Sequence, residues 1–275
     1  MASQNIPDTP PPYQGGENAP EYSESDKYFY TDLPADKEKE LLKSSAASIS
    51  STESAVTPVS SKPFTPGHSL FINARGKALI RLPTPSSELE ILVHRPDASL
   101  AYVSTRKKRC SGSATLSSPE RGDLLFTEYF FGPNRDPIIH HINRPDEKAI
   151  PGIQVTGRWT SRTTSFSTPD GSMFEWSYVK EADGDGKKVQ LVVLERIDAG
   201  GKRRVAQLVR NERTRPPKTS ELTAGNGGEL VFDADAKKVV GEELVVATCL
   251  LMLKKEIDRR RALQFAVLAG GAGGG

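Results

Sequence analysis

The sequence predicts an all-β fold with one buried helix: a closed antiparallel β-barrel of about twelve strands around a hydrophobic C-terminal helix, preceded by a disordered tail. Three observations lead to this prediction. Residues 1–66 are rich in Pro, Ser, Thr, Glu and Asp, and the run SSAASISSTESAVTPVSSKP within them lacks any apolar periodicity. From about Ser69 onward, short apolar segments recur roughly every 10 to 15 residues. Near the C-terminus follows one helical segment that is apolar on nearly all sides.

The tail, residues 1–66, is rich in Pro, Ser, Thr, Glu and Asp. Such a composition cannot bury enough apolar surface to offset the chain entropy lost on folding, so we expect disorder. Residues 1–62 contain five Lys against ten Asp and Glu, a net charge of −5, whereas the whole chain carries +2. The remainder is therefore mildly basic. It favours anionic surfaces, but it lacks the dense positive field of a nucleic-acid-binding protein.

The strand region predicts a chain of hairpins. Turn residues at Asp170-Gly171, Asp183–Gly186 and Asp198–Gly201 separate runs that alternate between apolar and polar residues. Successive hairpins form a meander, and closing that sheet removes its unpaired edges. The predicted strand segments are SLFIN, KALIRL, LEILVHR, SLAYVSTR, SATLSS, LLFTEYFF, PIIHHI, IQVTGRWTS, TTSFST, MFEWSYVKE, KVQLVVLERI, RVAQLVRNE and ELVFDA.

The helix is predicted over residues 241–265, GEELVVATCLLMLKKEIDRRRALQF, with acidic residues in its first turn. Leu244 to Leu253 are apolar all round, and this stretch is far shorter than the roughly 20 residues that cross a bilayer. The barrel is the apolar tunnel that such a helix needs. Arg259–Arg261 are expected at its hydrated end, beside the last carbonyls. The predicted domains are therefore a tail (1–66), a barrel (67–268) and a flexible Gly-rich end (269–275).

Two phrases carry a resemblance to a known family. RWTSRTTSFSTPDGSMFEWSYVKE and TAGNGGELVFD are similar to filamentous-fungal proteins of the tubby-like superfamily, which also holds tubby C-terminal domains, LURP-one-related proteins and phospholipid scramblases. The resemblance covers residues 69 to about 268 and implies binding rather than catalysis, in tubby proteins of phosphoinositide head groups. The basic residues that do this do not align here, so lipid specificity is not carried over. The calcium-binding and cysteine-rich segments of scramblases are absent.

One motif in the tail fits a peptide-recognition pattern. Pro10, Pro11 and Tyr13 are the fixed positions of P-P-x-Y, the ligand of WW domains, whose aromatic rings accept polyproline II prolines. A functional motif would recruit a WW-domain protein such as a ubiquitin ligase. The alternative is a Pro-rich spacer that happens to meet a tyrosine.

A basic run follows one predicted strand. Arg106, Lys107, Lys108 and Arg109 form a candidate patch for anionic lipid, because each cation near an acidic leaflet contributes about 1 kcal/mol. The alternative is a solvated loop that protects a strand edge from aggregation.

Catalytic, cofactor and metal sites are not expected. The sequence holds no G-x-S-x-G, P-loop or Cys-His pair with recognisable spacing. His140 and His141 are consecutive strand residues, so they point to opposite faces. Cys110 and Cys249 are expected to stay unpaired thiols, and without a signal segment the chain is expected in the cytoplasm.

The predicted function is therefore a non-enzymatic binding or adaptor protein, monomeric, cytoplasmic and peripheral at membranes. It would engage anionic phospholipid head groups with the barrel and WW-domain proteins with the tail. The rival hypothesis is a small-molecule carrier or enzyme that uses the barrel mouth. The helix discriminates between them, because a plugged barrel leaves no room for an internal ligand.

Overall fold

The computed structural model describes residues 63–78, 88–109, 111–132, 135–142, 151–157, 161–182 and 188–271. The chain divides into two units, residues 1–57 and 58–275, and every described residue lies in the second. The predicted tail up to residue 62, its P-P-x-Y motif and the Asp183–Gly186 turn therefore lie outside the described residues.

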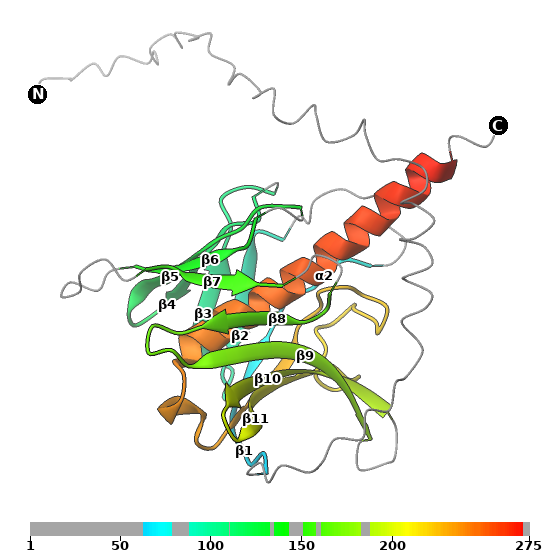
Figure 1. The fold of residues 1–275 in the computed structure, drawn as a ribbon. Coiled ribbons are helices and arrows are strands. Elements are labelled where there is room, and N and C mark those ends of the chain that lie inside the picture. The colour runs from blue at the N-terminus through cyan, green and yellow to red at the C-terminus, as the bar shows by residue number, and fades with distance from the viewer. Residues whose placement is uncertain are drawn as a thin grey trace, which may run out of the picture. The chain divides into compact units, whose positions relative to one another are not determined.

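Twelve antiparallel strands close into one barrel, as the sequence predicted (Figure 1). Each strand pairs with its neighbours in the chain, and β1 closes the barrel by pairing with both β2 and β12. The strands are β1 (Pro66–Ile72), β2 (Glu90–His94), β3 (Leu100–Thr105), β4 (Ala114–Ser118), β5 (Gly122–Glu128), β6 (Ile138–His141), β7 (Ile153–Thr156), β8 (Thr164–Ser167), β9 (Met173–Ala182), β10 (Lys188–Asp198), β11 (Gly201–Val209) and β12 (Gly228–Asp233).

The hairpin between β8 and β9 shows how the sequence specifies this sheet. Gly171 takes a φ of +83° in the turn, a conformation that costs side-chain-bearing residues steric strain. In β9, Phe174 and Trp176 are fully buried, while Met173 is exposed. The period of two thus directs one face inward, and the predicted Asp170-Gly171 and Asp198–Gly201 hairpins are confirmed by the pairing of β8 with β9 and of β10 with β11.

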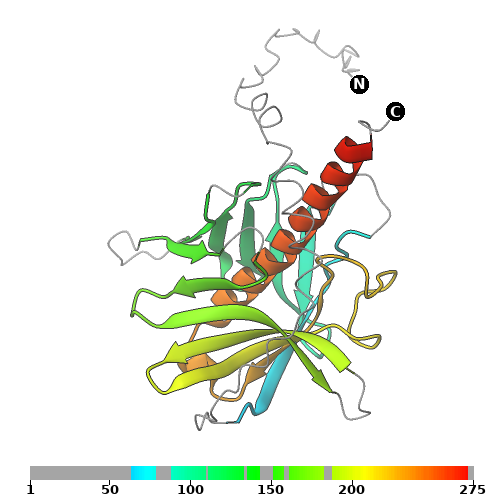
Figure 2. The same cartoon turned by 45° about the vertical axis from the view of Figure 1, so that its right-hand side comes forward.

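One long helix fills the barrel. After the short 3-10 helix η2 (Ala236–Lys238), α2 (Glu242–Gly271) runs through the interior, and its C-terminal part rises beyond the strands (Figure 2). Val245, Val246 and Cys249 are fully buried inside the sheet. Trp176 Nε1 donates to Thr248 Oγ1 at 3.0 Å, so the one polar group of this indole is satisfied within the core.

A buried ion pair fixes the middle of α2 to the barrel. Arg210 donates to both carboxylate oxygens of Glu256, at 2.8 and 3.1 Å, and the Gly225 amide donates at 2.8 Å. Tyr178 also donates its hydroxyl to Glu256. Burial alone would raise the pKa of Glu256, but the Arg210 charge and these hydrogen bonds hold it below its ordinary value.

The structure differs from the predicted helix at its C-terminal end. α2 continues to Gly271 rather than ending near Phe265, so part of the Gly-rich segment is helical. Arg259–Arg261 consequently lie inside the helix. The prediction that they lie beside its last carbonyls is therefore wrong. Of the predicted strand segment KALIRL, Lys77 forms an isolated bridge with Ala224, and residues 79–82 lie outside the described residues.

Candidate functional site

The connections between strands lie at two ends of the barrel. At the helix-start end, the turns 95–99, 119–121, 168–172 and 199–200 surround η2 and the first turn of α2. At the helix-exit end, the connections 73–89, 106–113, 129–137, 157–163 and 210–227 surround α2 where it leaves the barrel, as far as they are described. The side chains at these two ends differ in character.

Large apolar side chains are exposed at the helix-exit end. Leu222 is 61% exposed and Leu263 is 55% exposed, and they are joined there by Leu89, Phe130 and Phe131. The other large exposed apolar residues in the described part of the chain, Phe71 and Met173, lie on strands. Five of the seven large exposed apolar side chains in the described part of the chain therefore lie at this end, and such a concentration often marks an interaction site.

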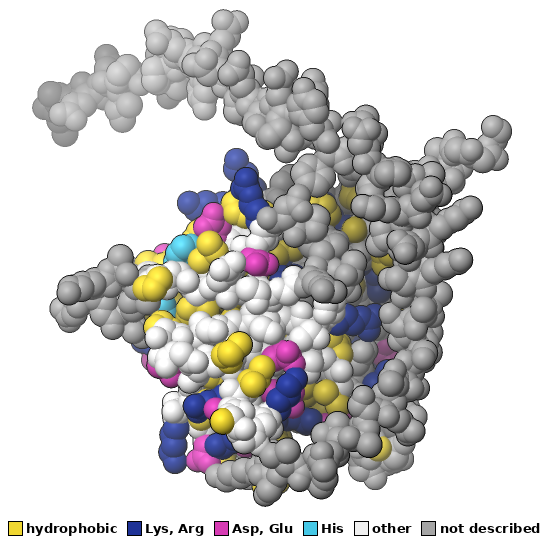
Figure 3. Space-filling view, viewed as in Figure 1, with side chains coloured by type: hydrophobic (Ala, Val, Ile, Leu, Met, Phe, Trp, Pro, Cys, Tyr) yellow, Lys and Arg dark blue, Asp and Glu magenta, His cyan; other side chains and the backbone are white. Residues whose placement is uncertain are grey.

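Exposed cations outnumber exposed carboxylates among the described residues of the same connections. The carboxylates are Asp136, Glu212 and Glu221. The exposed cations are Arg75, Lys107, Lys108, Arg109, Arg135, Arg162, Arg213 and Lys218. Dark-blue Lys and Arg side chains project at the top of the described surface in Figure 3. Among the described residues of the helix-start turns and η2, the exposed charges balance, with Arg121, Lys237 and Lys238 against Asp97, Glu120 and Asp170.

Arginines join the apolar groups to the cationic ones. The Arg261 guanidinium lies 4.9 Å from the ring centroid of Phe131, and the Arg135 guanidinium lies 4.8 Å from that of Phe130. These cation–π contacts place charge and apolar surface in a single layer.

Two further arginines bind the connections to the helix. Arg260 donates to the Leu222 carbonyl at 2.8 Å, and Arg259 donates to the Ser161 carbonyl at 3.0 Å. These bonds hold Ser161 and the 210–227 connection against α2, so that the exposed surface rests on a fixed frame.

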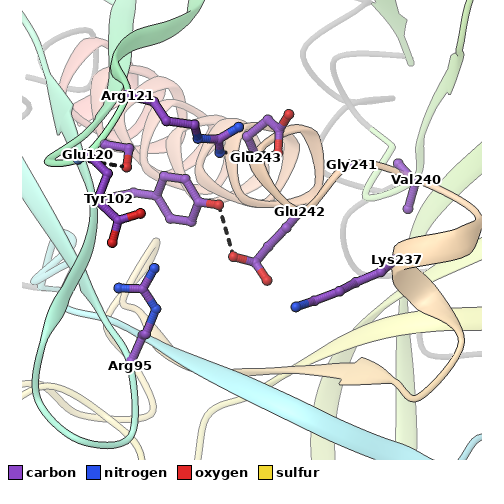
Figure 4. Close-up of a pocket in the computed structure, with 10 residues that line it drawn as sticks. Arg95, Tyr102, Glu120, Arg121, Lys237, Val240, Gly241, Glu242 and Glu243 are labelled. Carbon is purple, nitrogen blue, oxygen red and sulfur yellow. Dashed lines mark hydrogen bonds and ion pairs between the residues drawn. The ribbon is translucent and has the colours of Figure 1, made fainter.

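A pocket of about 320 Å³ lies at the helix-start end (Figure 4). Its walls come from the turns around β2 to β5, from η2 and from the start of α2. The lining residues are Arg95, Tyr102, Ser118, Glu120, Arg121, Lys237, Val240, Gly241, Glu242 and Glu243.

Some of the charged groups around this pocket are paired. Tyr102 donates to Glu242 at 2.9 Å, and His68 Nε2 lies 2.5 Å from the other oxygen of the same carboxylate. Burial and the Glu242 charge raise the pKa of the Tyr102 hydroxyl, so it remains a donor. Arg121 lies 3.7 Å from Glu243. The mixed lining therefore selects neither anions nor cations by net charge.

A cluster of charged side chains is buried inside the helix-exit end. The Asp258 side chain is fully buried and receives Lys254 Nζ at 2.9 Å and Arg261 Nη1 at 3.1 Å. Lys254 also lies 5.5 Å from the ring centroid of Tyr129. Burial and the Asp258 charge raise the pKa of Tyr129, so its hydroxyl stays protonated. Beside this group is a cavity of about 50 Å³.

The predicted basic patch does not form a single surface. Lys107, Lys108 and Arg109 are exposed at the helix-exit end, but Arg106 is only 9% exposed and faces the interior. The alternation of β3 continues past Thr105 and turns this side chain inward. Arg106 Nη2 donates to the Glu88 carbonyl. A lipid patch at this connection would therefore comprise three of the four residues.

The tail motif, the cysteines and the histidines were the other candidate residues in the sequence. Pro10, Pro11, Tyr13 and Cys110 lie outside the described residues. Cys249 is a free, fully buried thiol, and burial raises its pKa to about 12. His140 Nε2 lies 3.4 Å from a Glu128 oxygen. Among the described residues, no group of three or more His, Cys, Asp or Glu side chains is placed to hold a metal ion.

Sequence reasoning missed the apolar residues of the helix-exit end. Phe130 and Phe131 were assigned to the strand segment LLFTEYFF, whereas β5 ends at Glu128. The run Tyr129-Phe130-Phe131 breaks the alternation of that strand and precedes Gly132-Pro133. This was an available signal that the aromatic residues lie in a loop.

Comparison with known proteins adds no relative. No family model, no curated protein and no solved structure matches this chain. Across the described residues, none of the helices combines the length and the apolar character needed to span a membrane.

Proposed function

We propose that this protein is a binding module, not an enzyme, that docks peripherally on anionic lipid head groups at the cytoplasmic face of a membrane. The docking surface is the helix-exit end. One observation carries the proposal: the exposed apolar side chains of the barrel ends and an excess of exposed Lys and Arg occur together there. Peripheral proteins combine the same two features when they bind acidic membranes.

The two features would act together energetically. Each Lys or Arg close to an acidic leaflet contributes about 1 kcal/mol, and the effect decays within a Debye length. Apolar side chains such as Phe131 and Leu222 add about 25 cal/mol for each Å² that they bury between the lipids. Neither contribution is large alone, but several cations beside several apolar groups give stable attachment.

The carrier hypothesis is less well supported. The cavity beside α2 measures about 50 Å³, far below the roughly 300–1,000 Å³ of pockets that hold small organic ligands. The pocket at the helix-start end is large enough at about 320 Å³, but charged side chains line most of it. Ligand pockets are predominantly apolar, with few polar groups.

The tubby-like resemblance supports the proposal only by analogy. The barrel around a helix is the architecture that the resemblance implied, and a shared fold does not fix a function. Membership of that superfamily and binding of phosphoinositides in particular remain predictions. We propose binding of anionic head groups as a class.

Vesicle sedimentation of the full chain tests this surface. We expect binding to phosphatidylserine-containing vesicles at low salt, and loss of that binding in high salt or with neutral phosphatidylcholine vesicles. Replacing Lys107, Lys108 and Arg109 with Ser removes three cations and is expected to weaken binding by roughly 100-fold.

A matched control removes the same charge from the other end of the barrel. The variant with Arg121, Lys237 and Lys238 changed to Ser is expected to bind vesicles nearly as well as the wild type, because those cations lie at the helix-start end. Equal losses in the two variants would show that net charge, not the helix-exit end, drives binding. No binding by the wild type would remove the proposal.

For the tail we propose recruitment of a WW-domain protein through Pro10, Pro11 and Tyr13. A peptide of residues 5–20 is expected to bind a WW domain of the P-P-x-Y class with micromolar affinity, because its prolines and tyrosine occupy two adjacent grooves. Tyr13→Ala should abolish the binding in fluorescence titration. An unmodified peptide that fails to bind at high-micromolar concentration would identify the segment as a spacer.

A further inference from the structure

One lysine of α2 is nearly buried and has no partner. Lys255 is 9% exposed, and it forms no hydrogen bond or ion pair within the described part of the chain. The preceding residue, Lys254, is paired instead, because its Nζ donates to the Asp258 carboxylate at 2.9 Å. Buried polar groups are nearly always paired, so the amine of Lys255 is an exception that calls for an explanation.

The charged groups around Lys255 come from α2 and from the connection between β5 and β6. Arg259 lies one turn further along α2, and its Nη1 donates to the Ser161 carbonyl at 3.0 Å. The Asp136 carboxylate attracts the Lys255 charge without forming an ion pair with it, and it accepts a hydrogen bond from Gln154 Nε2 at 3.2 Å. Lys255 therefore has a cation of its own helix beside it and lacks a direct counter-ion.

This setting makes the amine reactive. Burial, assisted by the Arg259 charge and opposed by the Asp136 charge, lowers the pKa of Lys255 to about 8. An unperturbed lysine has a pKa of about 10.4, so near neutral pH the neutral fraction of Lys255 is roughly a hundredfold larger. Desolvation and a neighbouring cation are the two ways in which proteins activate a lysine as a nucleophile.

Access to the amine favours a small reaction partner. A side chain with so little exposure can meet a small molecule at its tip, whereas a protein or an acyl group on a bulky carrier cannot approach it. The product should also suit the surroundings, because an anionic adduct would pair with Arg259 and an uncharged adduct would not. Carbon dioxide meets both conditions, since it has only three atoms and its adduct with an amine is an anion.

We propose that Lys255 binds carbon dioxide reversibly as a carbamate, which Arg259 stabilises. The lone pair of the neutral Nζ forms a bond to the carbon atom, one C=O electron pair moves onto oxygen, and the nitrogen releases one proton to water. The step involves no oxidation or reduction. The side chain changes from a cation to an anion, and the remaining N–H groups of the Arg259 guanidinium are available to bind it. This site does not depend on the proposed membrane docking.

Chemical trapping tests the site in the wild-type full chain. The protein is equilibrated with isotope-labelled bicarbonate and carbon dioxide near neutral pH. Triethyloxonium then converts each carbamate into a stable ethyl carbamate, which mass spectrometry of peptides locates. A synthetic peptide with one lysine and a free α-amino group is trapped in the same sample. Its α-amino group, with a pKa of about 7.7–8.0, reports that carbamates form and are captured.

We expect the labelled fraction of Lys255 to exceed that of the peptide lysine roughly tenfold or more, because more of its amine is neutral. Lys254 should carry much less label than Lys255, because its Nζ donates to Asp258. Equal labelling of Lys255 and the peptide lysine, in a sample whose α-amino group is labelled, would overturn the proposal.

Carbon NMR of the labelled sample gives a second readout. The wild type is expected to show a carbamate resonance that Lys255→Arg loses, because arginine keeps the positive charge but removes the nucleophilic amine. Lys107→Arg, which alters an exposed lysine, should keep the resonance. A resonance of equal intensity in the wild type and in Lys255→Arg would assign the carbamate to another amine and contradict the proposal.

Discussion

Replacing Glu256 with alanine is expected to lower the free energy of unfolding by about 3–5 kcal/mol. The change leaves the Arg210 guanidinium, whose side chain is 11% exposed, without its carboxylate. The Gly225 amide and the Tyr178 hydroxyl lose the same acceptor. Because these three donors come from β9 and the β11–β12 connection, the loss also releases α2 from the barrel wall. Urea denaturation followed by Trp fluorescence measures the effect.

An ion pair with an exposed carboxylate provides the control. Glu221 lies 3.9 Å from Arg215, whose side chain is 11% exposed, but the Glu221 side chain is itself 75% exposed, so water already solvates its carboxylate. Glu221→Ala should therefore change the urea midpoint only slightly. If both variants lose similar stability, the Glu256 pair is not the buried anchor that its geometry indicates.

The same carboxylate predicts a dependence of stability on pH. The folded-state pKa of Glu256 lies below its ordinary value, so the folded state favours the charged form. Its contribution is complete above the unfolded-state pKa of about 4.3 and is lost as the pH falls through the lower folded-state value. The stability difference between the wild type and Glu256→Ala should therefore shrink below about pH 4. A constant difference down to pH 2.5 would contradict this linkage.

The barrel was predictable because its signals are local. Alternation in segments such as MFEWSYVKE, together with Gly at turns that need a positive φ, specifies hairpins without knowledge of the tertiary structure. The apolar stretch Leu244 to Leu253 required an enclosure, which the closed sheet supplies. The helix end was predicted less well, since the run from Ala266 to Gly271 has only weak intrinsic signals for or against a helix.

The candidate sites were less predictable because they depend on which loops meet. Arg106 and Lys107 are neighbours in the chain, yet one faces the cavity and the other faces solvent. The alternation of β3 contained this information, but the basic run concealed it. The contacts of Arg261 with Phe131 and of Arg260 with the Leu222 carbonyl join distant segments, and no spacing in the sequence reports them.

Gly225→Ala is expected to destabilise the protein by about 2–5 kcal/mol. Gly225 has a φ of +69°, where a side chain costs about 1–2 kcal/mol of strain. An added Cβ would also lie 2.5 Å from the Leu253 carbonyl oxygen and 2.5 Å from Ile257 Cγ1. Relieving that overlap requires α2 or the β11–β12 connection to move, which costs about 1–3 kcal/mol more.

Gly171 separates these two costs. It has a φ of +83°, but an added Cβ would meet no atom within 4 Å. Gly171→Ala should therefore lose only the strain contribution of about 1–2 kcal/mol. The excess loss in Gly225→Ala then measures how tightly α2 is packed against the connection that carries Leu222, one of the exposed apolar residues of the helix-exit end. Equal losses in the two variants would mean that this connection yields easily and that the proposed membrane surface does not rest on a rigid frame.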